Sequence, residues 1–264
     1  MHMKIITTCT VAALSLVAGL TSCRSVPFTD RPQLMLTSEA EEAQMGLTAF
    51  SQYKSQYNRS ANGTYNAALS RCGSAIVNSS GLNTNYKWDF QVFQSNEQNA
   101  FALPGGKVAV YSGLMDLMHN EAELAFVVAH EIAHVYARHG GERVSWGYMK
   151  TLGATALSAT DNSDLRQLYD LAADYGVMKP FSRSNEYEAD QIGLLLMAKA
   201  GYNPKAAVEF WSRFTEGKTT GTLSGLMSTH PRDEDRIEAL NEFMPTALEA
   251  YNKAKVKRGY GASL

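Results

Sequence analysis

The sequence predicts an α+β fold that is mainly helical and carries a small antiparallel β-sheet. Apolar residues recur at helical spacing over most of the chain from residue 38 onward. Between residues 88 and 113 the pattern changes. WDFQVF at 88–93 alternates apolar with polar residues, and NAFALPGGKVAVYSG at 99–113 indicates two short strands around a Pro-Gly-Gly turn. With 264 residues, 45% of them hydrophobic, the chain can bury one sizeable core.

The helix boundaries are predicted from capping signals. Ser38 and Asn120 are N-cap residues, and Gly140-Gly141 is expected to end the helix that begins after Asn120. Asn203-Pro204 and Pro231 open two later helices. The predicted helices are 38–57, 64–79, 120–139, two stretches within 142–178, 183–200, one from 204, 231–243 and 245–257.

The first 37 residues are predicted to be a lipoprotein signal peptide (1–22) and a tether (23–37), followed by one domain over 38–264. Lys4 precedes a short apolar run that is typical of a signal peptide and too short for a comfortable membrane span. Leu20-Thr21-Ser22-Cys23 resembles a bacterial lipobox, so we expect lipidation of Cys23. The alternative is an ordinary secretory signal with an incidental cysteine. Arg24, rather than an aspartate, follows Cys23, which by resemblance to enterobacterial sorting favours the outer membrane, facing the periplasm.

Charge and cysteine content exclude some classes of function. The chain has 24 basic and 26 acidic residues, and removal of residues 1–22 takes away only Lys4, leaving 23 against 26, or −3. No basic stripe or RNA-binding signature is present, which argues against nucleic acid as a partner. After Cys9 is removed and Cys23 lipidated, Cys72 has no partner within the chain. We therefore expect a buried free thiol and no disulfide framework.

The chemistry is predicted from AFVVAHEIAHVYARH at 125–139. His130 and His134 are four residues apart, so on a helix they lie about 40° apart on one face. Both imidazoles can reach one tetrahedral zinc ion, and Glu131 lies beside that face, where it can contact water on the metal. The apolar surroundings predict a buried helix. A buried ionisable group needs a partner, and a metal ion supplies one.

A third ligand is expected from SRSNEYEADQIG at 182–193. Glu186 and Asp190 are four apart and share a helical face, whereas Glu188 points away and is interpreted as a solvated or merely structural acid. E-x-x-x-D on a helix downstream of H-E-x-x-H is the gluzincin arrangement. The fuller pattern resembles the HtpX-like zinc metallopeptidases, in particular the bacterial periplasmic lipoproteins of the LoiP and BepA type. The matching segments lie within residues 40–243: NAFALPGG at 99–106, YSGL at 111–114, HEIAH at 130–134, residues 182–193, STHP at 228–231, and Arg236-Ile237.

The resemblance implies a gluzincin-type metallopeptidase domain with one zinc ion per chain. His130, His134 and Glu186 would hold the zinc, Glu131 would be the general base, and Asp190 would hydrogen-bond a ligating imidazole. The implied reaction is hydrolysis of a peptide bond by metal-activated water, with no covalent acyl-enzyme.

Two further residues have more than one interpretation. His230 is either a stabiliser of the oxyanion, as in one family-derived role, or a fourth zinc ligand, as in BepA-like members; the third possibility is a cap or surface histidine. Arg236 is expected to aid transition-state charge, with a salt bridge to a nearby acid as the alternative. His119 and His139 are interpreted as solvated histidines outside the site, His139 because it lies half a turn from the metal face if the helix continues. Strand 101–103 is either a surface for binding a peptide by β-augmentation or plain sheet core.

The function these residues favour is a membrane-anchored zinc endopeptidase that hydrolyses misfolded or misassembled envelope proteins. A second hypothesis is a metal-stabilised periplasmic chaperone or scaffold with latent proteolysis. A third, a structural lipoprotein without metal, is disfavoured by the intact ligand set. Nothing in the sequence indicates an oligomeric state.

Overall fold

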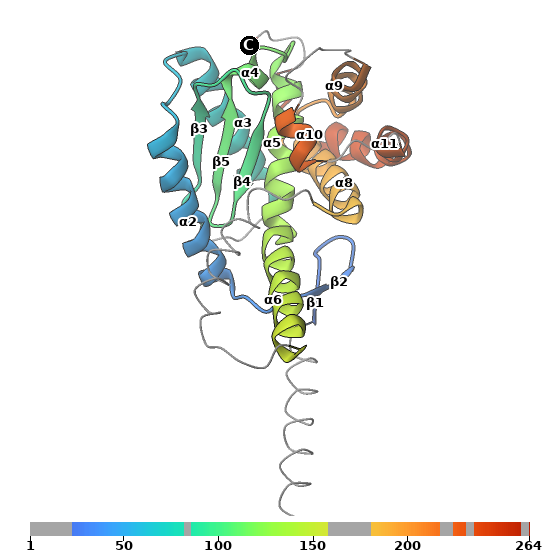
Figure 1. Cartoon of the computed structure of the whole chain (residues 1–264). Helices are drawn as coiled ribbons and strands as arrows, with labels where there is room; N and C mark the ends of the chain where they lie inside the picture. Colours follow the sequence, from blue (N-terminus) through green and yellow to red (C-terminus); the bar gives the residue numbers. More distant parts are fainter. Residues whose placement is uncertain (1–22, 82–85, 158–180, 217–223, 231–234, 260–263) are drawn as a thin grey trace, which may run out of the picture.

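A computed structural model of the chain describes residues 23–81, 86–157, 181–216, 224–230, 235–259 and 264. Its central element is α5 (Glu121–Tyr136), which lies between a small sheet and a group of C-terminal helices (Figure 1). The fold class is therefore as predicted, mainly helical α+β. The predicted signal peptide, 1–22, lies outside the described residues. Within the described part of the chain, no helix combines the length and apolar character needed to cross a membrane.

The three-stranded sheet has the order β3-β5-β4, with β3 at Asp89–Phe93, β4 at Ala100–Leu103 and β5 at Lys107–Tyr111. β4 and β5 form the predicted antiparallel hairpin around Gly105 and Gly106, both at positive φ. β3, however, pairs with β5 in parallel, so this sheet is mixed rather than wholly antiparallel. The reason is that residues 94–99 lead from β3 to the far edge of the sheet, and β5 then returns between the two strands. A sequence pattern identifies strands, but it does not identify which strands are neighbours.

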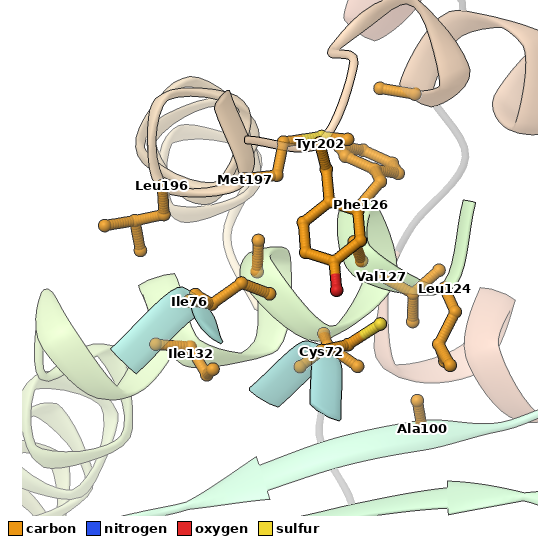
Figure 2. Packing of buried hydrophobic residues seen from close by; sticks show 14 of the residues in the cluster. Cys72, Ile76, Ala100, Leu124, Phe126, Val127, Ile132, Leu196, Met197 and Tyr202 are labelled. Carbon is orange, nitrogen blue, oxygen red and sulfur yellow. The ribbon is translucent and has the colours of Figure 1, made fainter. Parts of the chain in front are cut away.

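Helices cover both faces of the sheet. α2 (Glu39–Gln56) packs on one face through Phe50, against Phe93 and Tyr111. α3 (Gly63–Ser80) packs on the other face and against α5. Figure 2 shows the larger core between α3, α5 and the C-terminal helices, where Cys72 and Tyr202 meet. Cys72 is a fully buried free thiol, as predicted.

The remaining helices are α4 (Ser112–Met115), α6 (His139–Leu157), α8 (Arg183–Lys199), α9 (Lys205–Glu216), α10 (Ser224–Thr229) and α11 (Asp235–Lys253). α8 packs along α5, and α11 packs on α8 and α9. The predicted break between 231–243 and 245–257 is wrong, because Pro245 lies inside α11. Leu240 and Ala247, on either side of the proline, are both buried in the core. This packing holds the helix together where proline removes one backbone hydrogen bond.

The end of α5 also differs from the prediction. The helix ends at Tyr136, and Arg138 takes a left-handed conformation with φ +54°. Gly140-Gly141, predicted as the helix end, instead lies in the first turn of α6. Gly141 lies close to the Glu42 carboxylate, so a methyl group at this position would collide with it. Gly141 therefore allows close packing against Glu42 and does not end a helix.

Residues 23–37, predicted as a tether, contain a β-hairpin of β1 (Cys23–Ser25) and β2 (Pro32–Leu34). This N-terminal hairpin lies beside α6 (Figure 1), and its turn buries Val26 completely. Thus part of the predicted tether belongs to the folded structure.

Candidate metal centre

Three elements bring four donor side chains together. α5 contributes His130 and His134, α8 contributes Glu186, and His230 follows α10. One donor atom from each of the four residues lies within 4.8 Å of the others, and all four side chains are buried. The Nε2 atoms of His130 and His134 are 3.1 Å apart, and each lies 3.5 Å from a carboxylate oxygen of Glu186.

Local contacts hold this geometry. Ser182 caps α8 by accepting a hydrogen bond from Asn185 N–H, which fixes the first turn carrying Glu186. Phe181 N–H donates to Thr229 O, so the start of α8 is tied to the residue before His230. The Phe181 ring stacks on His134, with the ring centroids 3.9 Å apart. The sequence motif sets the spacing of the donors within each helix. The two contacts of Phe181 hold the start of α8 next to His134 and to the residue before His230.

His230 enters the donor cluster. Its Nδ1 lies 3.1 Å from Oε1 of Glu186 and 3.3 Å from Nε2 of His130, while its Nε2 lies 3.2 Å from Oε1 of Glu131. Burial disfavours the charged imidazole, but the carboxylates of Glu186 and Glu131 outweigh this and raise the pKa of His230 to about 10. The interpretation of His230 as a surface or capping histidine does not fit this position.

Charges around the other donors act in different directions. Burial opposes ionisation of Glu186, yet His230 and His130 hold its pKa well below the usual range. Burial also opposes protonation of His130, but Asp190 and Glu186 raise its pKa. For His134, burial and the neighbouring histidines outweigh Glu186 and lower the pKa. The lowered pKa values of Glu186 and His134 favour an ionised carboxylate and a neutral imidazole, which are the forms that bind a metal ion.

Asp190 and Arg236 stand behind the cluster. Oδ1 of Asp190 lies 2.9 Å from Nδ1 of His130. Arg236, also buried, donates to both oxygens of Asp190 at 2.7 and 2.8 Å, and its Nη1 lies 2.9 Å from Oε2 of Glu186. Arg236 thus forms the salt bridge that the sequence left as the alternative to a transition-state role.

Glu131 lies between the donors and the edge of the sheet. Its Oε2 accepts a hydrogen bond from the backbone N–H of Ala102, at 3.1 Å. β4 is an edge strand of the three-stranded sheet, so Ala102 N–H points away from β5 toward the centre. Leu103 is buried in the core, which fits the interpretation of strand 101–103 as sheet core. Ala102 faces Glu131, and the binding of a peptide to this strand stays a prediction.

The prediction that His139 is a solvated histidine outside the site is wrong. His119 is exposed, as predicted. His139 is fully buried, with its Nδ1 2.9 Å from Nδ1 of His134. Because α5 ends at Tyr136 and Arg138 reverses the backbone, His139 lies beneath His134 instead of half a turn away. Glu188 is a buried structural acid that contacts Nε2 of His139 at 2.8 Å, so the solvated alternative is excluded.

The donor set fits a zinc ion. Three imidazoles and one carboxylate are nitrogen and oxygen ligands that zinc prefers, and their burial is that of a metal centre rather than of a surface acidic patch. Asp190 and His139 lie at the opposite ring nitrogens of His130 and His134, where they fix which nitrogen faces the cluster.

A helical fold with H-E-x-x-H on one helix and a third donor on a second helix defines a gluzincin-type metallopeptidase. Residues 64–244 match the model of Peptidase family M48, and the chain belongs to this family. Mitochondrial metalloendopeptidase OMA1 of Schizosaccharomyces pombe is 34% identical over 244 residues, covering 88% of this chain and 71% of that protein. Human OMA1 is 31% identical over 196 residues, covering 69% and 36%. The beta-barrel assembly-enhancing protease of Escherichia coli K12 is 29% identical over 175 residues, covering 61% and 36%.

Proposed function

We propose that this chain is a zinc-dependent endopeptidase that hydrolyses misfolded or misassembled proteins of the bacterial envelope. The observation that carries the proposal is the convergence of His130, His134 and Glu186 beside Glu131 and the edge strand β4. Zinc is the metal that best fits this donor set. The names of the relatives, metalloendopeptidase and assembly-enhancing protease, support the same activity.

His130, His134 and Glu186 would hold the metal, and Asp190 would orient the ring of His130. A bound zinc ion would supply Lewis-acid activation of a water molecule and of the scissile carbonyl. Glu131 is the general base: its carboxylate accepts the proton of the attacking water and then donates it to the leaving amine. The Ala102 N–H bond to Oε2 holds the Glu131 carboxylate beside the donors.

The edge of β4 is the proposed binding surface for the substrate backbone. A peptide in extended conformation can donate its N–H groups to the C=O groups of Ala100 and Ala102, which are directed away from β5. The N–H of Ala102 is already bonded to Glu131. Such binding reads the main chain more than the side chains. Selectivity then comes from the substrate being unfolded, which suits a protease for misassembled proteins.

Membrane attachment is proposed through a lipid on Cys23 at the outer membrane, with the domain in the periplasm. Cys23 begins β1, so a lipid there would place the N-terminal hairpin next to the membrane surface. The lipobox-like sequence ending at Cys23 supports this proposal, and mass spectrometry of the membrane fraction would detect the acylated cysteine.

The second candidate function, a metal-stabilised chaperone or scaffold with latent proteolysis, is favoured by one observation. The His230 imidazole reaches both Glu186 and Glu131, so it occupies the space next to the general base that a substrate would need. If His230 is an inhibitory fourth ligand, His230→Ala cleaves faster than the wild type. If it stabilises the oxyanion, His230→Ala cleaves more slowly.

The decisive experiment compares the wild type with Glu131→Gln. Glutamine keeps the size of the side chain but does not accept the proton, so we expect about one zinc per chain in both proteins and cleavage of an unfolded protein only in the wild type. Absence of bound zinc from the wild type contradicts the metallopeptidase proposal. Zinc in both proteins with no cleavage by either, even after His230→Ala, supports the scaffold.

A further inference from the structure

His139 makes a contact with a donor histidine that the mechanism above does not use. The Nε2 of His134 faces the donor cluster, so its Nδ1 carries the ring hydrogen when Nε2 serves as a ligand. This Nδ1 lies 2.9 Å from Nδ1 of His139. His139 must therefore be the acceptor, which places its own hydrogen on Nε2.

The hydrogen on Nε2 of His139 has a carboxylate to receive it. Oε2 of Glu188 lies 2.8 Å away, and both residues are buried. Each hydrogen in the chain from His134 through His139 to Glu188 thus has one donor and one acceptor. A single arrangement of tautomers satisfies the whole chain, with Nε2 of His134 left free toward the cluster.

Glu188 is held by the N-terminal hairpin. Arg31, in the turn that precedes β2, donates through Nε to Oε2 of Glu188 at 3.0 Å. The other end of its guanidinium binds both oxygens of Glu142 at 2.7 Å. Thr29, in the same turn, also donates to Glu188. The chain of contacts therefore runs from residues close to Cys23 to a donor of the metal centre.

The second donor histidine has the same support in shorter form. Arg236 binds Asp190, whose carboxylate lies at Nδ1 of His130. Arg31 and Glu188 repeat this arginine–carboxylate pair on the other side of the cluster, with His139 inserted between carboxylate and ligand. Two independent arginine–carboxylate pairs thus lie behind the two histidines of H-E-x-x-H.

We propose that His139 and Glu188, held by Arg31 of the N-terminal hairpin, are positioning residues for His134, so that the hairpin contributes to metal affinity. This inference rests on the proposed metal site. Partners behind a metal-binding histidine fix the ring orientation and its tautomer, and their loss typically weakens metal binding about 10- to 100-fold. A merely structural role for the same buried groups would change stability without changing the affinity of the folded protein for zinc.

The test uses full-length, zinc-loaded protein, with the zinc Kd measured by competition against a chelator. His139→Phe keeps a ring but has neither acceptor nor donor, and we expect its Kd to rise about 10- to 100-fold. His139→Gln can accept from His134 and donate to Glu188, so it should recover most of the affinity. Arg31→Met removes the arginine's contacts with Glu188 and Glu142 without changing a residue that touches His134, and should raise Kd several-fold.

Arg213→Met is the matched control. Arg213 pairs with Glu123, a buried acid at the other end of the same helix α5, at 2.6 Å. This variant should lower the melting temperature of the metal-free protein and leave the zinc Kd within about two-fold of the wild type. The Co²⁺-substituted proteins give a second readout, because the visible absorption of the metal reports ligand geometry: His139→Phe should shift it and Arg213→Met should not.

The results separate the inference from the function on which it rests. If the wild type binds no zinc, both fail. If the wild type binds one zinc and cleaves substrate, but His139→Phe and Arg31→Met bind zinc as tightly, only the positioning role fails. The same conclusion follows if Arg213→Met weakens zinc binding as much as Arg31→Met does. Should His139→Phe fail to fold, Arg31→Met against Arg213→Met still decides.

Discussion

Gly193 of α8 lies directly against the backbone of His130 in α5. A methyl group built on Gly193 would be 2.9 Å from both Cα and N of His130, closer than any carbon side chain packs. The absence of a side chain therefore allows α8 to approach α5 at the turn that carries the first donor histidine. Because α8 also carries Glu186, this contact helps to set the distance between the carboxylate and the imidazoles.

Gly193→Ala is expected to destabilise the protein and weaken its metal centre together. The neighbouring atoms are backbone, which cannot move aside, so the two helices must separate at a cost of about 1–3 kcal/mol in the free energy of unfolding. The resulting displacement of Glu186 should also reduce zinc affinity. Urea denaturation and chelator competition measure the two effects.

Gly147→Ala is the control for this substitution. Gly147 lies in α6, where an added methyl group meets nothing within 4 Å. Alanine favours helix by about 0.5–1 kcal/mol over glycine, so this variant should be slightly stabilised and bind zinc normally. Equal behaviour of the two alanine variants would contradict the role given to Gly193.

Arg236→Met is expected to be among the most destabilising substitutions in the chain. It leaves the carboxylates of Asp190 and Glu186 buried without the guanidinium that now contacts both. Removing one partner of a buried ion pair costs about 3–5 kcal/mol, and we expect a loss of that size in urea denaturation of the metal-free protein. Lys253→Met, which breaks an exposed ion pair with Glu249 in α11, should leave stability unchanged within error. A loss no larger than that of Lys253→Met would show that Arg236 contributes no net stability.

Those parts of the centre that depend on spacing within one helix could be predicted from the sequence. Helical geometry places His130, Glu131 and His134 relative to one another, and it puts Glu186 and Asp190 on one face of α8. That this face meets the two histidines was implied by the resemblance to the family. The structure brings all five together, with His230. A short-range pattern is enough here because each helix is long and its buried face is apolar.

His139 and Arg31 could not be found in this way. The end of α5 is set by a left-handed arginine, Arg138, rather than by the glycines that follow it, and non-glycine residues seldom take that conformation. Arg138 is held there by Glu42, more than ninety positions earlier in the chain. Arg31 contacts Glu142 and Glu188, which lie more than one hundred positions later in the chain. The only signal for His139 in the sequence was its position, directly after Arg138 and close to the H-E-x-x-H motif.

The last prediction concerns acid stability, and it involves Glu121 at the start of α5, away from the metal centre. Burial opposes ionisation of this carboxyl, but Arg71 and Tyr202 outweigh it and lower its pKa below the ordinary value of 4.5. A carboxyl whose pKa is lower in the folded state stabilises the fold above its ordinary pKa. That contribution is lost as the pH falls through the folded-state value. Stability from this residue should therefore be complete at pH 7 and decline below about pH 4.5.

Glu121→Gln isolates this contribution. Glutamine still accepts a hydrogen bond from Tyr202 but has no charge for Arg71, whose half-exposed side chain limits the pair to about 1 kcal/mol. At pH 7 the variant should unfold at a lower urea concentration than the wild type, and the difference should shrink steadily as the pH falls from 5 to 3. All other titrating groups are common to both proteins, so they cancel in this difference. A gap that stays constant or widens in acid would mean that the Glu121 carboxyl is not held ionised by Arg71, and that its pKa is set by burial instead.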